Sequence, residues 1–165
     1  MIRRASRELE VEKIREFNSE HRELISDFLE SHQVLAATRS ILARIPEYLA
    51  SVPTAWIYNA RASSGKLVAF DIAEFGAKHY AFYMFNFRSR QGTVPGASDL
   101  LLHTLIKEAS QKDKSFVNLG LGLNEAVAFF KKKWGGQPFL RHELVFFGPG
   151  RPSFWETIWQ GLSRS

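Results

Sequence analysis

Two stretches in the first third of the chain repeat apolar residues with the period of an α-helix. The first carries Leu24, Ile25, Phe28 and Leu29, and the second carries Ile41, Leu42, Ile45, Tyr48 and Leu49. This spacing predicts two amphipathic helices, each with one buried face. Residues 9–17, which precede them, mix apolar and charged side chains and predict either a first strand or the start of a longer helix.

After Pro53 the pattern changes to short apolar runs separated by turns. The runs cover residues 54–60, 67–75 and 79–87, and a glycine lies in each of the two turns between them. Because short turns join antiparallel neighbours, the sequence predicts a three-stranded meander. The third run is apolar on both faces, which predicts a central strand covered by helices on both sides.

The second half alternates helix and strand signals. A loop at residues 88–96 precedes a predicted helix at 98–112 and a predicted strand at 116–121. A strand, a helix and a strand in this order form a right-handed crossover, which makes the two strands parallel.

The remaining signals are a helix from Asn124 to Trp134, a Gly135-Gly136 stop and a last strand region at 139–147. We therefore expect one α+β domain over residues 1–165. It has three layers, with helices on both faces of a mixed, mostly antiparallel central sheet.

Residues 152–165 carry a separate helical signal. Ser153 and Glu156 match a capping box, and large apolar residues including two tryptophans repeat with helical phase. We expect a C-terminal amphipathic helix. Its apolar face docks on the protein's own sheet, contacts a second copy in a homodimer, or meets a membrane surface.

The composition narrows the chemistry. The 165 residues include no cysteine, which excludes disulfides, thiolate metal sites and cysteine nucleophiles. The five histidines lack ligand spacing, so we expect no metal. Without an apolar run behind the basic N-terminus, or any stretch long enough to span a membrane, the expected location is cytoplasmic.

The net charge is +5 and is unevenly distributed. Residues 76–151 hold 11 Lys and Arg against 5 Asp and Glu, a net +6, whereas residues 1–75 hold 10 against 11, a net −1. The second half is therefore the part expected to face an anionic partner, unless the charges simply form a solvated surface.

Three short motifs lie in that half: Pro-Gly-Ala-Ser-Asp-Leu-Leu at 95–101, Phe-Val-Asn-Leu-Gly-Leu-Gly at 116–122 and Phe-Phe-Lys-Lys-Lys-Trp-Gly-Gly at 129–136. With the order of elements, they resemble the GNAT acyltransferase superfamily. Within it, the branch of Fem-type aminoacyltransferases and lysylphosphatidylglycerol synthase C-terminal domains is most similar. The resemblance implies an acyl donor, either acetyl-CoA or another acyl-CoA, or aminoacyl-tRNA.

The loop before the 98–112 helix departs from that family. The usual signature begins with Arg or Gln and supplies backbone amides to a pyrophosphate. Here the first position of the signature is Thr93, and Pro95 removes one amide donor. Gly96, Ala97 and Ser98 remain as candidate anion-binding residues, with Ser98 also able to cap the helix.

Lys131 is the first candidate for catalysis. Many acetyltransferases have a tyrosine at this position, seven residues after the asparagine that corresponds to Asn124. The Fem-type branch has Phe-Lys there, which Phe130-Lys131 of this chain resembles. Helical phase places Lys131 at the rim of the apolar face that contains Val127 and Trp134. Its ammonium group therefore either reaches out to water or meets a bound anion.

Further candidates come from strand ends and loops. Glu74 shares a strand face with Val68, Phe70 and Ile72, and is the candidate general base unless it only lies in solvent at the strand end. The resembling fold implies donor contacts at Asn86 and Phe87, where the central strand leaves its parallel neighbour. Asn124 caps its helix or touches the donor, and Arg88 and Arg90 pair with phosphates or are solvated.

The expected function is N-acyl or aminoacyl transfer from acyl-CoA, or from aminoacyl-tRNA, to an amine acceptor. Two alternatives stay open. One is an inactive GNAT-like module that binds RNA or an acidic lipid. The other is an interaction protein that works as a dimer or at a membrane surface.

Overall fold

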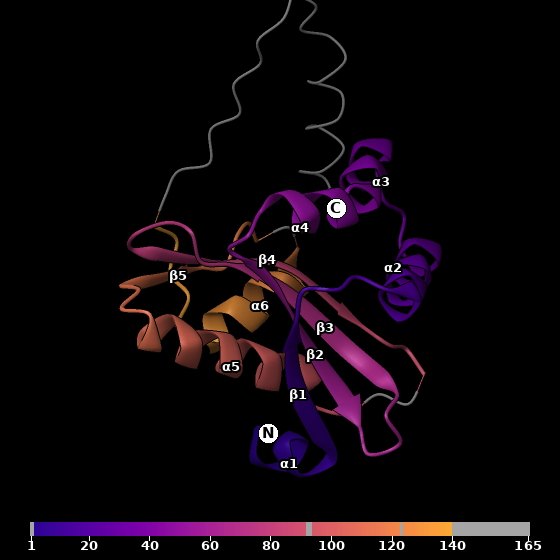
Figure 1. Ribbon diagram of the computed structural model, residues 1–165, viewed down its shortest axis with the longest axis horizontal. Helices are drawn as coiled ribbons and strands as arrows, with labels where there is room; N and C mark the ends of the chain where they lie inside the picture. The colour runs from indigo at the N-terminus through magenta and orange to yellow at the C-terminus, as the bar shows by residue number, and fades with distance from the viewer. Residues whose placement is uncertain (1, 92–93, 123, 140–165) are drawn as a thin grey trace, which may run out of the picture.

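The computed structural model describes residues 2–91, 94–122 and 124–139, and Figure 1 shows their helices and strands in three layers. The strands are β1 (Leu9–Ile14), β2 (Ala55–Ala62), β3 (Leu67–Glu74), β4 (Tyr80–Arg88) and β5 (Phe116–Asn118). The helices are α1 (Ile2–Glu8), α2 (Ser19–Ser31), α3 (Ala36–Ala43), α4 (Ile45–Ser51), α5 (Ala97–Gln111) and α6 (Glu125–Lys133). The predicted fold class is confirmed.

The five strands of the described residues form one sheet in the order β1-β2-β3-β4-β5. The first four pair antiparallel, and β4 pairs parallel with β5 after the crossover through α5, as predicted. The residues at 9–17 that predicted either a strand or a helix contribute β1, and the sequence did not predict the short α1 before it.

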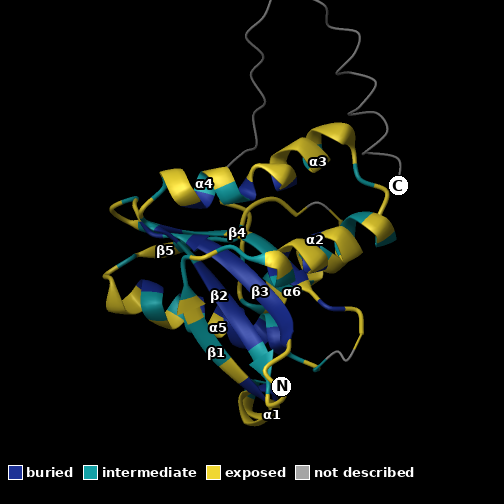
Figure 2. Ribbon diagram, turned by 45° about the vertical axis from the view of Figure 1, so that its right-hand side comes forward, coloured by how far each residue is buried: buried dark blue, intermediate teal, exposed yellow. Residues whose placement is uncertain are grey.

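Helices cover both faces of the sheet and bury a separate core on each. On one face, α1 and α5 pack against the sheet around Leu9, Leu101 and Leu105. On the other face, Leu24 of α2 and Leu49 of α4 pack over the sheet with residues of α3. Figure 2 shows β2 and β3 buried between these two layers.

The periodic stretch at 41–49 forms two helices rather than one. The break lies at Arg44, between α3 and α4, and Pro46 stands in the first turn of α4. Proline has no amide hydrogen to donate to the carbonyl four residues earlier, at Leu42, so a continuous helix would lose that bond. The apolar spacing nevertheless continues across the break, because Leu42, Ile45 and Leu49 are all buried.

The most buried strand is β3, whereas the sequence predicted the fully covered strand at β4. Seven of the eight β3 residues are buried. Most β4 residues are only half-buried, and Met84 is 40% exposed. The reason is that β5 pairs with only three β4 residues, instead of extending to residue 121 as predicted.

Apart from Phe139, the C-terminal predictions fall on residues that the structure does not describe. The last strand region was predicted at 139–147, and the amphipathic helix at 152–165. Both stay predictions. Within the described ranges, no helix has the length and apolar content needed to cross a membrane.

A buried histidine fixes the start of α2 on the sheet. The backbone amide of Asn18 donates to His21 Nδ1 at 3.1 Å, so the ring proton lies on Nε2, which donates to Asn59 Oδ1 at 3.0 Å. Asn59 in turn donates to Glu12 at 2.9 Å. Burial lowers the pKa of His21, and Arg61 adds to this, while Asn59 and the nearby carboxylates of Glu20 and Glu12 oppose it.

This arrangement predicts that the fold loses stability as the pH falls below about 6.5, the pKa of an unfolded histidine. The unfolded chain takes up a proton that folded His21 resists, so the free energy of unfolding falls by up to about 1.4 kcal/mol per pH unit. Urea unfolding between pH 7 and 5.5 measures this loss.

The variant His21→Gln keeps an acceptor for the Asn18 amide but does not titrate. We expect a smaller pH dependence in this variant than in the wild type, together with a lower stability at pH 7. An equally steep loss of stability in both proteins would show that His21 is not the titrating group.

Candidate functional site

The sheet opens between β4 and β5. The two strands pair only from Tyr80 to Phe82, opposite residues 116–118, and β4 continues to Arg88 without β5 beside it. The side chain of Asn118 accepts the Gly120 amide at 2.8 Å, which turns the chain away from the strand direction. A register shift in β4 opposite Ile72 and Ala73, which leaves Met84 as the extra residue, adds a local bend.

Lys131 lies at this opening. Its ammonium group donates to the carbonyl oxygen of Leu121. A Cβ atom on Gly120 would stand 3.8 Å from Lys131 Nζ and 3.9 Å from the carbonyl oxygen of Tyr83, so the lysine approaches the free edge of β4. Desolvation lowers the pKa of Lys131. Lys131 is half-buried, but no residue of α6 is fully buried, so the predicted position at the rim of a core stays a prediction.

Hydrogen bonds cap both ends of α6, the helix that carries Lys131. Asn124 caps the helix by accepting the Val127 amide at 2.9 Å. At the other end Gly135 is left-handed, and Gly136 donates to the carbonyl oxygen of Lys131 at 2.9 Å. The predicted Gly135-Gly136 stop is confirmed, and Asn124 has the capping role that the sequence allowed.

The N-terminal turn of α5 differs from the prediction that Ser98 caps it. The N-cap is Gly96, with φ 88°, and no side chain caps the helix. Ser98 lies inside the first turn and donates from Oγ to Asn86 Oδ1 at 3.1 Å. In the described part of the chain, the amides of Ser98 and Asp99 have no hydrogen-bond acceptor. This turn therefore presents free amides, as an anion-binding helix end does.

Beneath that turn lies a cluster of buried polar side chains that the sequence did not predict. Asp71 is fully buried on β3, and its Oδ1 accepts the side-chain amide of Asn86, the residue opposite it on β4. Its Oδ2 has no hydrogen-bond partner among the described residues. Burial raises the pKa of Asp71 well above its ordinary value, and the Asn86 and Tyr83 side chains offset this only in part.

Tyr83 and Asp99 extend the cluster toward α6. Burial raises the pKa of Tyr83 well above its ordinary value, and the carboxyls of Asp71 and Asp99 raise it further. Asp99 accepts Trp134 Nε1 at 2.8 Å and pairs with Lys133 at 2.5 Å. A hint of this cluster was present in the sequence, because Asp71 stands between apolar residues in the middle of a strand.

Glu74 is the last residue of β3. Thr54 Oγ1 donates to its Oε1 at 2.5 Å, and the Gly76 amide donates to the same atom. Its register partner is Phe82, the last β4 residue paired with β5. Within the described residues Oε2 accepts no hydrogen bond, so one carboxylate oxygen is available for proton transfer.

The remaining candidates are not all brought together. Phe87 is buried against Phe70, with ring centroids 5.1 Å apart, so its side chain belongs to the core on the α2 side. The opening begins at Tyr83, earlier than the Asn86-Phe87 position expected from the sequence. Arg88 and Arg90 are exposed at the end of β4.

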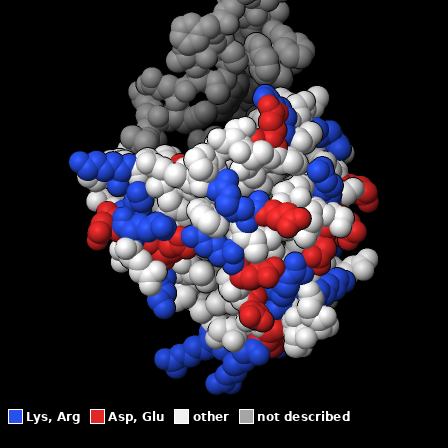
Figure 3. Space-filling model, viewed as in Figure 1, with Lys and Arg blue, Asp and Glu red and all other residues white. Residues whose placement is uncertain are grey.

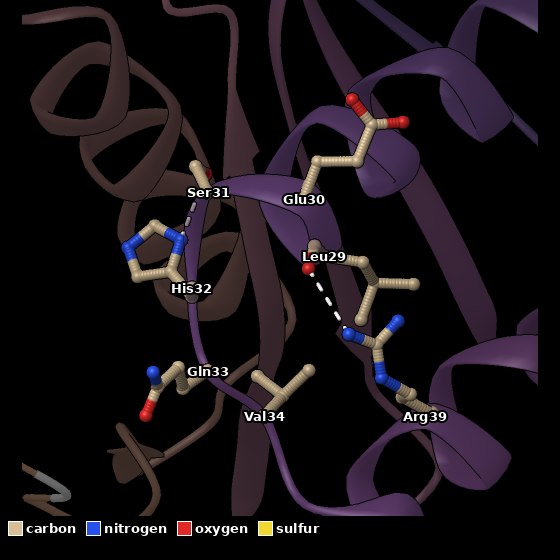
Figure 4. Close-up of a pocket in the computed structure, with 7 residues that line it drawn as sticks. All are labelled: Leu29, Glu30, Ser31, His32, Gln33, Val34 and Arg39. Atoms are coloured by element: carbon tan, nitrogen blue, oxygen red, sulfur yellow. Dashed lines mark hydrogen bonds between the residues drawn. The ribbon is translucent and has the colours of Figure 1, made fainter.

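A separate concavity of about 500 Å³ lies where α2 passes into α3. Figure 4 shows Glu30, His32 and Arg39 around it, with Arg39 donating to the Leu29 carbonyl at 3.2 Å. Phe28 connects this concavity to Phe87, the buried residue near the end of β4. The Phe28 ring stacks on His32 at 4.5 Å and meets the Phe87 ring edge-on at 5.6 Å. None of the sequence-predicted site residues lines this concavity.

Solved structures share this fold. A ribosomal-protein-alanine N-acetyltransferase from Brucella melitensis matches 85% of this chain and 99% of its own, with 14% identity and a TM-score of 0.66. A Trypanosoma brucei acetyltransferase matches 84% of this chain and 99% of its own, with 15% identity and a TM-score of 0.61.

A GNAT family acetyltransferase from Elizabethkingia anophelis with acetyl-CoA bound matches 77% of this chain and 74% of its own, with 11% identity and a TM-score of 0.55. No family model and no curated protein sequence matches the chain. At such low identities the comparisons show the fold alone, which is the GNAT acyltransferase fold predicted from the motifs.

The raised pKa of Asp71 predicts that Asp71→Asn stabilises the protein at neutral pH. Above about pH 4 an unfolded aspartate releases its proton, while the folded protein retains it on Asp71. The wild type therefore loses up to about 1.4 kcal/mol per pH unit until the folded pKa is reached, and an asparagine avoids this loss. Urea unfolding at pH 5, 6 and 7 should show an advantage of Asp71→Asn that grows with pH.

Asp99→Asn is the matched control, because it replaces a buried carboxylate that is paired with Lys133. We expect this variant to lose stability instead of gaining it. An Asp71→Asn variant that is less stable than the wild type at every pH would contradict a neutral Asp71.

Proposed function

We propose that the protein is an N-acyltransferase that binds an acyl-CoA in the opening between β4 and β5 and transfers the acyl group to an amine. The observation that carries this proposal is Lys131. Its half-buried ammonium group lies beside the free edge of β4 and has no carboxylate partner among the described residues. A lysine desolvated in this way stabilises a negative charge that arrives or develops next to it.

The first turn of α5 supports a phosphate-binding role at the same opening. The free amides of Ser98 and Asp99, with the positive end of the helix dipole, favour an anion. Gly96 and Ala97 bring the backbone into this turn, although Ala97 donates to Val94 at 3.2 Å and Pro95 has no amide hydrogen. Arg88 and Arg90 are exposed nearby in sequence and are proposed to pair with the outer phosphates.

The proposed reaction is direct transfer. The neutral amine attacks the thioester carbonyl, a tetrahedral oxyanion forms, and the carbon–sulfur bond breaks to release a thiolate. Lys131 is proposed to donate a hydrogen bond to the oxyanion and then a proton to the thiolate. Glu74 is proposed to accept the proton of the attacking amine through Oε2, directly or through water.

Aminoacyl-tRNA is the second candidate donor, favoured by the Phe130-Lys131 pair that resembles the Fem-type branch. Lys133 lies over the Phe130 ring at 5.5 Å. The surface in Figure 3 interleaves acidic and basic side chains and gathers basic ones at the lower end, where α1 with its three arginines lies. Acyl-CoA is therefore the donor that we place first.

A donor panel tests the proposal. Acetyl-CoA, longer acyl-CoAs and a charged tRNA are added separately, and the thermal midpoint is measured. A ligand at about 100 times its Kd stabilises the fold by about 2.7 kcal/mol, which shifts the midpoint by several degrees. A midpoint that no donor shifts would rule out the transferase function, and a shift by charged tRNA alone would select the second donor.

Lys131→Met should lower kcat for acyl transfer by about 10²-fold, because one donor to the oxyanion is lost. The release of free CoA thiol in the presence of an amine panel measures this rate. Lys132→Met is the control, because Lys132 is the exposed neighbour on the same helix and should retain its rate. Equal rates in the two variants would remove Lys131 from the mechanism.

A further inference from the structure

A chain of polar side chains joins the middle of β3 to the first turn of α5. Asn86 Nδ2 donates to Asp71 Oδ1, and Ser98 Oγ donates to Asn86 Oδ1 at 3.1 Å. Asp71 and Asn86 stand opposite each other in the β3–β4 register, so the sheet itself holds this pair in place. One side-chain amide thus connects a fully buried carboxyl to the helix end that presents free backbone amides.

The first turn of α5 has no side-chain cap of its own, as is also the case for α3 and α4. α2 and α6 are each capped by an asparagine side chain, Asn18 and Asn124. α5 begins at Gly96, which has no side chain to cap it, and glycine is the residue with the largest backbone freedom. The hydrogen bond from Ser98 to Asn86 therefore replaces a cap in fixing where the first turn lies above the sheet.

We propose that Asp71 is a positioning residue for the donor site. Through Asn86 and Ser98 it holds the first turn of α5, so that the backbone amides of Ser98 and Asp99 lie where they bind the donor's phosphate. The proposal rests on the proposed function, because it assigns to Asp71 an effect on a donor that Asp71 itself does not touch.

The protonation state of Asp71 fits this role. Oδ1 accepts the Asn86 amide, so a neutral Asp71 would carry its proton on Oδ2, the oxygen that has no partner among the described residues. A neutral carboxyl orients Asn86 without placing a negative charge under the turn, whereas an ionised one would repel an anionic donor. Burial, which raises the pKa of Asp71, thus keeps the connection compatible with phosphate binding.

The experiment compares two asparagines, the half-buried Asn86 and the buried Asn59, that each join a carboxyl to another element. Asn86→Ala breaks the connection to α5, and Asn59→Ala breaks the network of Glu12 and His21 on the opposite face. Ser98→Ala removes only the outer link and leaves the core intact. Two quantities are measured at a temperature at which all variants are folded: the Kd for CoA by calorimetry, and amide hydrogen exchange at residues 100–102.

We expect Asn86→Ala to raise the Kd for CoA by about tenfold and Ser98→Ala by about threefold, the losses of roughly one hydrogen bond. Both should speed exchange at residues 100–102. Asn59→Ala should leave the Kd and this exchange within about twofold of the wild type, although it lowers stability. Asp71→Ala should behave like Asn86→Ala, and Asp71→Asn, which keeps the acceptor atom, should restore tight binding.

Unchanged exchange and affinity in both Asn86→Ala and Ser98→Ala would overturn the positioning role. An equal loss of CoA affinity in Asn59→Ala would do the same, since it would indicate a general effect of stability. If the wild type does not bind CoA, the proposed acyl-CoA function fails, and the exchange data alone then decide whether Asp71 holds the α5 turn.

Discussion

The early end of β5 is the constraint on which the candidate site depends. Asn118 accepts the Gly120 amide and turns the chain after three paired residues, so the edge of β4 beyond Phe82 has no strand beside it in the described structure. The loop that follows passes over Lys131, whose ammonium group donates to the Leu121 carbonyl. If β5 continued along β4, its ladder would satisfy the same backbone groups that the opening leaves free.

Two polar networks, one on each face of the sheet, hold helix N-termini in place. On the α2 side, His21 and Asn59 connect the capped first turn of α2 to β2. On the α5 side, Asn86 connects Asp71 to an uncapped turn. Burying polar groups costs free energy unless each is paired. The network with an unpaired atom, Asp71 Oδ2, is the one that lies next to the opening, and its cost is limited by keeping the carboxyl neutral.

Local patterns predicted the parts of the molecule that depend on local geometry. The glycine pair predicted the end of α6, because a helix stop follows from residues within one turn. The length of β5 and the full burial of β3 depend on which strands become neighbours. The Asp71 cluster was missed for the same reason. Strand alternation puts Asp71 and Glu74 on different faces of β3, but only the β3–β4 register brings Asn86 against Asp71. Pro46 is a signal for a helix break. The apolar spacing continues across it, however, and led to the prediction of a single helix.

Partly buried cations in the first half of the chain and Lys131 in the second half differ in whether a carboxylate compensates their charge. In the first half, Arg61 pairs with Glu12 and Glu20, and Lys13 pairs with Glu108, so these partly buried cations are neutralised within the fold. Lys131 is held by a carbonyl dipole, which orients the ammonium group but leaves its charge uncompensated among the described residues. A partly desolvated cation of this kind gains more from an anion than a solvated or paired one does. The preference of the opening for a negatively charged ligand therefore follows from the missing carboxylate more than from the overall net charge.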